Sequence, residues 1–189
     1  MSGRIVLVRH GRSAHVPAGL LDRDALHGWH AAYDAAGIAG DDAPPAALRE
    51  LARSAAVIVS SDLPRAVASA ALLAPDRVAA ASALLRETAM VVPPWRGPRL
   101  PLMGWALVIG AGAGIRALRG EPAPAEVGAR ADAAAEWLAH LAGREGTVVA
   151  VTHATFRRHL ARALGGRGWR GTGPRRLHHW SAWAFSRGG

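Results

Sequence analysis

Three short runs of consecutive apolar residues predict strands that are buried on both faces. They cover residues 5–8, 56–60 and 147–152, and polar or turn residues bound each of them. Runs this short favour strands over helices, and continuous apolar runs are typical of a parallel sheet covered by helices on both sides. Two weaker patterns predict further strands at residues 77–81 and 179–186.

Between the strands, apolar residues recur at helical spacing. The clearest face runs through Val127, Ala131, Ala134 and Leu138, and Gly143 is expected to end that helix. The other predicted helices cover residues 24–36, 46–53, 63–73 and 155–164. Strands that alternate with helices in this way predict an α/β fold, a three-layer sandwich with a mostly parallel central sheet.

The middle of the chain breaks this alternation. Residues 91–101 contain four prolines, which predict a loop, while residues 102–118 are apolar and glycine-rich, which predicts one helix or two shorter pieces. We expect residues 1–189 to form one domain in which 91–118 is a cap or insertion. Residues 100–115 carry no charge, but they contain proline and glycine and fall short of the roughly 20 residues that a membrane span needs. No membrane span is therefore expected.

The composition constrains the compartment and the partners. A chain of 189 residues is long enough for one domain with a substantial core, and without cysteine it has no disulfide, zinc–thiolate site or thiol nucleophile. Arg9 interrupts the first apolar run too early for a signal peptide, so a cytoplasmic protein is expected. All 23 basic residues are arginine, against 14 acidic residues, and the net charge of +9 favours anionic partners.

Reactive side chains follow three of the predicted strands. Arg9 and His10 follow the first, Arg65 lies one helical turn beyond the second, and His153 follows the third. Because the carboxyl ends of parallel strands meet at the same edge of a sheet, we expect these four side chains to converge. Arginine binds phosphate through two parallel hydrogen bonds, and histidine donates to a phosphate oxygen or attacks the phosphorus. The sequence therefore predicts a phosphate site.

Four sequence blocks carry these residues and one acidic residue. They are residues 8–13 (Val-Arg-His-Gly-Arg-Ser), 60–66 (Ser-Ser-Asp-Leu-Pro-Arg-Ala), 149–153 (Val-Ala-Val-Thr-His) and 85–87 (Leu-Arg-Glu). In order and spacing they resemble the histidine phosphatase superfamily, whose fold is phosphoglycerate mutase-like. The segment 91–118 and the chain's ending resemble a small bacterial branch of that family with a Pro/Trp-rich insertion.

The resemblance implies a role for each residue. His10 would accept the phosphoryl group as phosphohistidine, while Arg9, Arg65 and His153 would bind the phosphoryl oxygens and stabilise the transition state. Glu87 would protonate the leaving oxygen and then activate the water that hydrolyses the intermediate. The resemblance implies neither a metal ion nor another cofactor.

The chain departs from the family pattern beside the first signature. Arg12 stands where glutamate is frequent, and His15 and Val16 stand where the family often has Trp-Asn, an asparagine that usually contacts phosphate. We expect Ser13 and His15 to take over that contact. Ala154 replaces the glycine that usually follows the third histidine.

Other interpretations stay open for the acidic residues near the site. Glu87 could instead be a solvated carboxylate that pairs with Arg86, an interaction worth little. Asp62 is expected to cap the helix at residues 63–73 rather than to take part in catalysis.

Two pairs of side chains near the site have alternative placements. We expect His178 and His179 to flank the last strand rather than to reach the site. In the insertion, Trp95 or Trp105 is expected to face the site as part of a lid, against the alternative that the insertion adds core or a dimer surface.

Together these features predict a phosphomonoesterase that acts on a phosphorylated small molecule through a phosphohistidine intermediate. A mutase-like phosphotransferase is the first alternative, and it is disfavoured because this chain ends soon after its last strand. A catalytically inactive module that binds a phosphorylated ligand or nucleic acid is the second. Eight arginines and no acidic residue follow Glu145, which would suit such binding, but retention of all four site residues argues for an enzyme.

Overall fold

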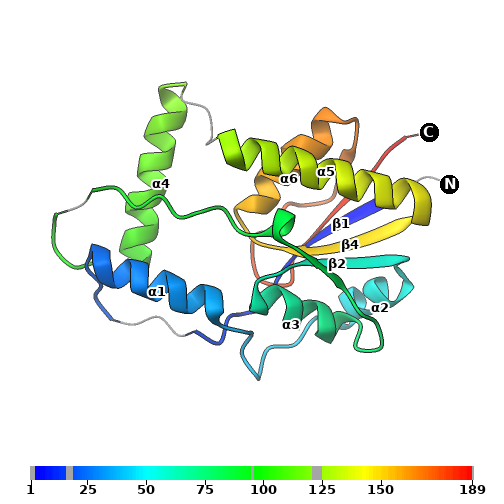
Figure 1. Cartoon of the computed structure of the whole chain (residues 1–189), viewed down its shortest axis with the longest axis horizontal. Coiled ribbons are helices and arrows are strands. Elements are labelled where there is room, and N and C mark those ends of the chain that lie inside the picture. The colour runs from blue at the N-terminus through cyan, green and yellow to red at the C-terminus, as the bar shows by residue number, and fades with distance from the viewer. Residues whose placement is uncertain (1–2, 16–18, 95, 121–124, 189) are drawn as a thin grey trace.

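A single mixed sheet organises the chain. The computed structural model describes residues 3–15, 19–94, 96–120 and 125–188. Within these residues the strands are β1 (Arg4–Arg9), β2 (Val57–Ser61), β3 (Ala80–Ser82), β4 (Thr147–Thr152), β5 (Arg170–Thr172) and β6 (Ala182–Ser186). Their order across the sheet is β3-β2-β4-β1-β6-β5 (Figure 1). The first four strands in this order are parallel, and β6 and β5 are antiparallel additions at one edge.

The apolar runs of the sequence are explained by burial on both faces of the sheet. In β1, Ile5 and Leu7 pack on one side of the sheet, while Val6 and Val8 pack on the other. β1 pairs with β4 in parallel, with Val6 opposite Val149. All four of these β1 side chains are at most 1% exposed. A strand with two buried faces has no polar alternation, and for this reason its pattern is continuous.

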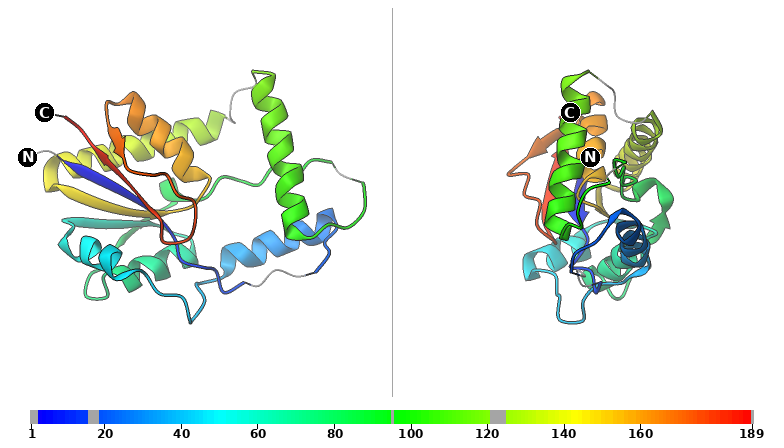
Figure 2. Two further views of the ribbon diagram at one scale, coloured as in Figure 1. Left: turned by 180° about the vertical axis from the view of Figure 1, so that it is seen from behind. Right: turned by 90° about the vertical axis from the view of Figure 1, so that its left-hand side faces the viewer.

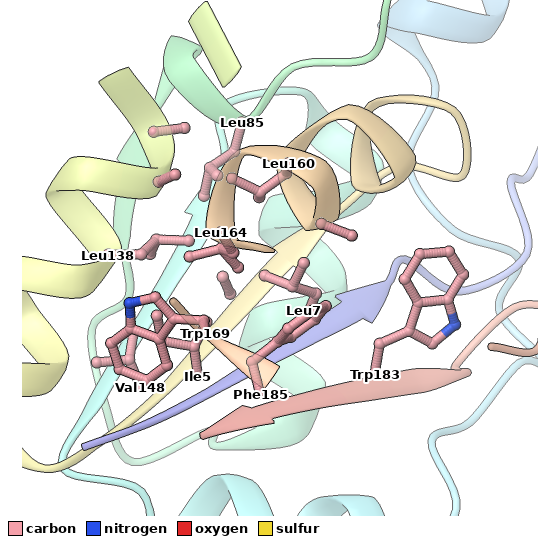
Figure 3. Packing of buried hydrophobic residues seen from close by; sticks show 14 of the residues in the cluster. Ile5, Leu7, Leu85, Leu138, Val148, Leu160, Leu164, Trp169, Trp183 and Phe185 are labelled. Carbon is pink, nitrogen blue, oxygen red and sulfur yellow. The ribbon is translucent and has the colours of Figure 1, made fainter. Parts of the chain in front are cut away.

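Helices cover both faces of the sheet, which confirms the three-layer α/β sandwich. The helices are α1 (Arg23–Ala35), α2 (Ala46–Ser54), α3 (Pro64–Leu73), α4 (Leu102–Leu118), α5 (Ala125–Glu145) and α6 (Phe156–Gly166), with a short 3-10 turn at Ala83–Leu85. Helices α5 and α6 pack on the face of Ile5 and Leu7, and Figure 3 shows Leu138, Leu160 and Leu164 meeting these strand residues. Helices α2 and α3 cover the opposite face.

The structure differs from the sequence prediction at three element boundaries. α5 continues past Gly143 to Glu145, and Gly146 adopts a φ of +103° after it. Because the helix stops where the backbone needs a positive φ, Gly143 is tolerated inside it at a modest cost. Arg170–Thr172, for which the sequence predicts no strand, form β5, and the last strand begins at Ala182 rather than at residue 179.

Helices α1 and α4 form a separate lobe at one end of the molecule (Figures 1 and 2). Leu21 and Leu100 form a short antiparallel bridge that joins the segments before the two helices. Trp105 of α4 is 1% exposed, packs with Leu21, Leu26 and other apolar side chains, and donates its indole N–H to the Leu21 carbonyl at 3.0 Å. The indole packs inside the lobe and its N–H is already paired, which favours the alternative that the insertion adds core. A lid role for Trp105 stays a prediction. Trp95 lies outside the described residues.

Trp105→Ala is expected to destabilise this lobe by about 3–5 kcal/mol, because it empties the centre of a small core and removes a buried hydrogen bond. Chemical denaturation monitored by circular dichroism measures the change. Leu107→Ala on the same helix is the matched control, because Leu107 is 71% exposed and its removal should cost less than about 0.5 kcal/mol. Equal losses in the two variants would contradict the lobe core described here.

Much of the rest of α4 is apolar and faces solvent. Met103, Leu107 and Leu118 are 73%, 71% and 90% exposed. Among the described residues, however, no helix combines the length and apolar character needed to cross a membrane.

Candidate active site

The carboxyl ends of β1, β2 and β4 bring His10, Arg9, Arg65 and His153 to one edge of the sheet. We call these four side chains the anion site. His10 follows β1 and donates its backbone N–H to the Thr152 carbonyl at the end of β4. The rings of His10 and His153 lie with centroids 5.0 Å apart, and both residues are buried. The predicted convergence of strand ends is thus present in the fold.

The contact of His10 with the next residue sets which ring nitrogen carries the proton. Its Nδ1 lies 2.6 Å from the Gly11 carbonyl oxygen. A carbonyl oxygen only accepts, so Nδ1 carries the hydrogen and Nε2 keeps a free lone pair in the neutral ring. Burial, with smaller contributions from the nearby charges of Arg65 and Arg9, lowers the pKa of His10 to about 3. The imidazole is therefore neutral, with Nε2 as its free acceptor.

Gly11 is required by the packing around its α-carbon. A Cβ at this position would lie 2.4 Å from the Trp180 ring and 2.6 Å from an Asp42 carboxylate oxygen. The Gly11 N–H donates to the Ser69 hydroxyl at 2.8 Å, and that hydroxyl donates to the Arg65 carbonyl at 2.6 Å. The loop after β1 is thus fixed directly to the helix that carries Arg65.

Arg65 is 1% exposed and is held by helix α1. Its guanidinium lies 3.1 Å from an Asp34 carboxylate oxygen, donates to the Tyr33 carbonyl at 3.0 Å, and stacks over the Tyr33 ring at 4.2 Å. Its Nε is buried and has no hydrogen-bond partner within the part of the chain that the structure describes. A buried cation with one partly exposed carboxylate and an unused donor is suited to receive an anionic ligand.

Tyr33 also acts on the second guanidinium of the site. Burial lowers the pKa of Arg9, and the nearby Tyr33 hydroxyl offsets part of that effect. Burial in turn raises the pKa of Tyr33, against the opposing charges of Arg65 and Arg9. Arg9 also donates to the Leu177 carbonyl. Tyr33 therefore contacts Arg65 directly and also interacts with Arg9.

His153 is completely buried, and neither of its ring nitrogens has a hydrogen-bond partner among the described residues. Burial lowers its pKa to about 2, and the charges of His10, Arg65 and Arg9 add to this effect. Unpaired buried polar atoms are rare in folded proteins and call for a ligand or a function. In the neutral ring one nitrogen carries a hydrogen, and that nitrogen is available to donate to an oxyanion bound beside His10.

Glu87 lies at the N-terminus of α6. Its carboxylate accepts hydrogen bonds from the backbone N–H groups of Thr155 at 3.1 Å and Phe156 at 2.8 Å. Arg130 holds the Glu87 backbone, donating to its carbonyl at 3.2 Å. The carboxylate therefore caps the helix, a position that stabilises negative charge. Its approach to the anion site is consistent with its effect on the pKa of Arg9.

The alternatives considered for the acidic residues near the strand ends are wrong. Arg86 does not pair with Glu87, because it makes two parallel hydrogen bonds to Asp62, at 2.6 and 2.8 Å. Asp62 consequently does not cap α3, whose N-cap residue is Leu63 with no side-chain cap. The N–H of Leu63 donates instead to the Ser61 hydroxyl, at 3.3 Å.

The contacts that the structure shows for Ser13 and His15 are with other protein groups. The Ser13 hydroxyl accepts from the His15 N–H at 3.2 Å, and Ser13 forms a backbone bridge with Ile38. The His15 ring packs against Trp29, with centroids 5.3 Å apart. Contact of either side chain with phosphate stays a prediction, and Val16 lies outside the described residues.

His179 lies closer to the site than its sequence position predicts. His179 does not merely flank the last strand, because its ring centroid lies 5.7 Å from that of His10. β6 begins at Ala182, which leaves His179 in the turn before the strand. Burial lowers the pKa of His179 to about 4, and the charge of Arg9 contributes. The adjacent His178 is exposed and does not enter the anion site in any contact of the described residues.

Sequence analysis also missed the residues that support the site. Tyr33 and Asp34 sit on a helix with no motif that marks them as partners of Arg65. Arg157 is completely buried, stacks over Trp183 at 4.0 Å, and donates to the Ser181 carbonyl at 2.6 Å. The sequence feature that could have marked Arg157 is its position four residues after His153, and in the structure its N–H donates to the His153 carbonyl at 3.0 Å.

The two buried histidines predict a pH-dependent stability. The pKa values of His10 and His153, about 3 and about 2, lie below the ordinary value near 6.5, so the unfolded chain binds more protons in the interval between. The free energy of unfolding should therefore be greatest above pH 6.5 and fall as the pH drops toward 3. Urea denaturation at pH 7.0 and 5.5 measures the difference.

His153→Gln should show a weaker dependence over the same interval, because one of the two groups no longer titrates. An unfolding free energy for the unchanged chain that is equal at the two pH values would contradict the burial of neutral imidazoles in the anion site.

Within the described residues, no group of three or more histidine, aspartate or glutamate side chains is arranged to hold a metal ion. The charges that face the anion site are instead the guanidiniums of Arg9 and Arg65. These fixed cations can bind and stabilise the oxygens of a phosphoryl group directly.

Comparisons with known proteins bear on the family and the fold of the chain. A model of the histidine phosphatase superfamily (branch 1) matches residues 5–184. The solved structure of mycobacterial hydrolase 2 is similar with a TM-score of 0.59 and 23% identity, covering 98% of this chain and 82% of that one. A mutant phosphoserine phosphatase from Entamoeba histolytica, solved with phosphoserine, gives 0.55 and 16%, covering 96% and 89%. No curated protein matches the chain.

Proposed function

Because the chain belongs to the histidine phosphatase superfamily, we propose that it is a phosphomonoesterase that forms a phosphohistidine intermediate on His10. The observation that carries the proposal is the fixed protonation of that ring. The Gly11 carbonyl holds the proton on Nδ1, so Nε2 presents a lone pair within a site that contains two guanidiniums. A neutral imidazole with an oriented lone pair is the nucleophile that phosphoryl transfer requires.

The first step transfers the phosphoryl group to the enzyme. The Nε2 lone pair attacks phosphorus, an N–P bond forms and the ester P–O bond breaks. Arg9, Arg65 and His153 bind the three non-bridging oxygens, whose charge spreads in the transition state. Glu87 in its protonated form gives a proton to the leaving oxygen, which departs as an alcohol.

The second step regenerates the enzyme. The Glu87 carboxylate takes a proton from a water molecule as that water attacks the phosphorus of phosphohistidine. The N–P bond breaks, inorganic phosphate leaves, and the Nε2 lone pair returns. Nδ1 keeps its proton throughout and donates it in a hydrogen bond to the Gly11 carbonyl, so the same ring nitrogen is protonated in both steps.

A screen of phosphate release tests this function directly. The purified chain is incubated with sugar phosphates, nucleotides, phosphoserine and lipid phosphates, and inorganic phosphate is measured. Phosphorylated protein should also be trapped at alkaline pH during turnover and lose its phosphate in acid. Absence of both phosphate release and a trapped phosphoenzyme across the panel would refute the proposal.

The same screen separates hydrolysis from the two alternatives. A mutase would return the phosphoryl group from the enzyme to an acceptor alcohol faster than to water, which labelled substrate with added alcohol detects. A binding module would retain a phosphorylated ligand without releasing phosphate, and a module for nucleic acid would show affinity that falls steeply with salt.

The chain further fits a single catalytic unit in which residues 91–118 are an insertion beside the site. Helix α1 carries Tyr33 and Asp34, which hold Arg65, and the insertion contributes Trp105 to the core under that helix. We infer that the insertion supports α1 and thereby the anion site, rather than closing over it with an indole.

A further inference from the structure

The turn at residues 177–181 is fastened to the end of β1 beyond the last pair of the sheet. The Arg9 N–H donates to the Ser181 carbonyl at 3.0 Å, and the Trp180 N–H donates to the Arg9 carbonyl at 3.1 Å. The Arg9 guanidinium also donates to the Leu177 carbonyl. The turn is therefore held against the residue that precedes His10.

Trp180 occupies a backbone conformation that a large side chain rarely adopts. Its φ is +59°, and a bulky non-glycine residue in this region is strained by about 1–3 kcal/mol. Its indole N–H donates to an Asp42 carboxylate oxygen at 2.8 Å, and its ring packs on Gly11. Strain of this kind persists where the surroundings hold it, and it is concentrated at functional sites.

The strained turn presents His179 to the anion site. The His179 ring is 5.7 Å from the His10 ring, close to the 5.0 Å that separates His10 from His153. His179 is only half-buried, unlike the other two rings, so it stands on the solvent side of the site. The charged and titratable groups that face it are Arg9, His10, Arg12, Asp42 and His178.

We propose that His179 is a further phosphoryl-binding residue, whose imidazole donates a hydrogen bond to an oxygen of the group bound at His10. The inference rests on the proposed function, since it adds a ligand to the same anion site. Burial and the charge of Arg9 lower the pKa of His179 to about 4, so the ring is neutral at pH 7. An arriving phosphate dianion opposes those positive charges and favours the protonated ring, which strengthens the hydrogen bond.

Binding of inorganic phosphate and of vanadate, measured by calorimetry, tests the inference without turnover. His179→Ala should weaken phosphate binding roughly 10- to 100-fold, the range for a hydrogen bond to a charged group. The affinity for vanadate, which resembles the transition state, should fall more than the affinity for phosphate. His179→Gln should recover part of the affinity, because its amide still donates.

His178→Gln is the matched control, since it changes the neighbouring imidazole of the same turn. Its phosphate affinity should stay within about twofold of the unchanged chain. The melting temperature of each variant is recorded alongside. If His179→Ala binds phosphate within twofold of the unchanged chain, or if His179→Gln binds as weakly as alanine, His179 supports only the turn and the inference is wrong.

The outcome is distinguishable from failure of the proposed function. A chain that binds phosphate through His179 but releases none from any substrate would overturn the phosphatase and uphold this inference. A chain that hydrolyses substrates but binds phosphate independently of His179 would do the reverse. Absence of phosphate binding in the unchanged chain would overturn the inference.

Discussion

His10→Ala is expected to lower kcat for p-nitrophenyl phosphate by about 10⁴-fold or more, because no other group can form the covalent intermediate. The variant should also yield no acid-labile phosphoenzyme when turnover is quenched at alkaline pH. Phosphate release from the aryl ester and phosphorylation of the intact protein, followed by mass spectrometry, are the two measurements.

His140→Ala is the matched control, since His140 is an exposed histidine on α5. It should retain the activity of the unchanged chain within about twofold. The far-ultraviolet spectrum of His10→Ala should be unchanged, which separates loss of the nucleophile from loss of the fold. A labile phosphate located on another histidine would show that His10 is not the nucleophile.

Glu87→Gln is expected to slow alkyl phosphates by about 10²–10⁴-fold but p-nitrophenyl phosphate far less. An alkoxide needs a proton to leave, whereas nitrophenolate departs without one. Glutamine keeps a carbonyl oxygen that can accept from the Phe156 N–H, so the helix cap is partly retained. The stability loss should stay near 0.3–1 kcal/mol, the value of one charge at a helix N-terminus.

The kinetic comparison uses the same variant on both substrates, and Glu136→Gln on the exposed side of α5 is the control. Equal losses on the two substrate types would assign Glu87 to the helix cap alone. The cap contacts stabilise the Glu87 carboxylate that forms when the leaving oxygen takes its proton, and the proton from the attacking water then returns Glu87 to its acid form.

The parts of the fold that the sequence predicts are those buried on two faces. Residues 5–8 and 147–152 are continuous apolar runs because helices cover the sheet on both sides, and both strands form as expected. β5 escaped prediction because its residues, Arg170–Thr172, are exposed and carry no apolar pattern. β5 forms because β6 offers it an edge to pair with, and that edge is positioned by residues far away in the sequence.

The residues of the site also divide into those that the sequence predicts and those that it does not. His10, Arg65 and His153 are placed by strand ends, whose common edge is a rule of parallel sheets. The supporting residues depend on tertiary approach. Asp34 becomes the partner of Arg65 only because α1 packs beside α3, and His179 reaches His10 only because Trp180 accepts a positive φ. Neither event leaves a periodic signal in the sequence.

The separate apolar core of the α1–α4 lobe has a consequence for heat inactivation. That core is distinct from the two clusters that enclose the sheet, yet α1 carries the tyrosine and the aspartate that hold Arg65. Small clusters of this kind open locally at a lower free-energy cost than the sheet. The catalytic activity should therefore fall on warming at a lower temperature than the one at which the sheet unfolds. It should be regained on cooling, because the sheet has stayed folded.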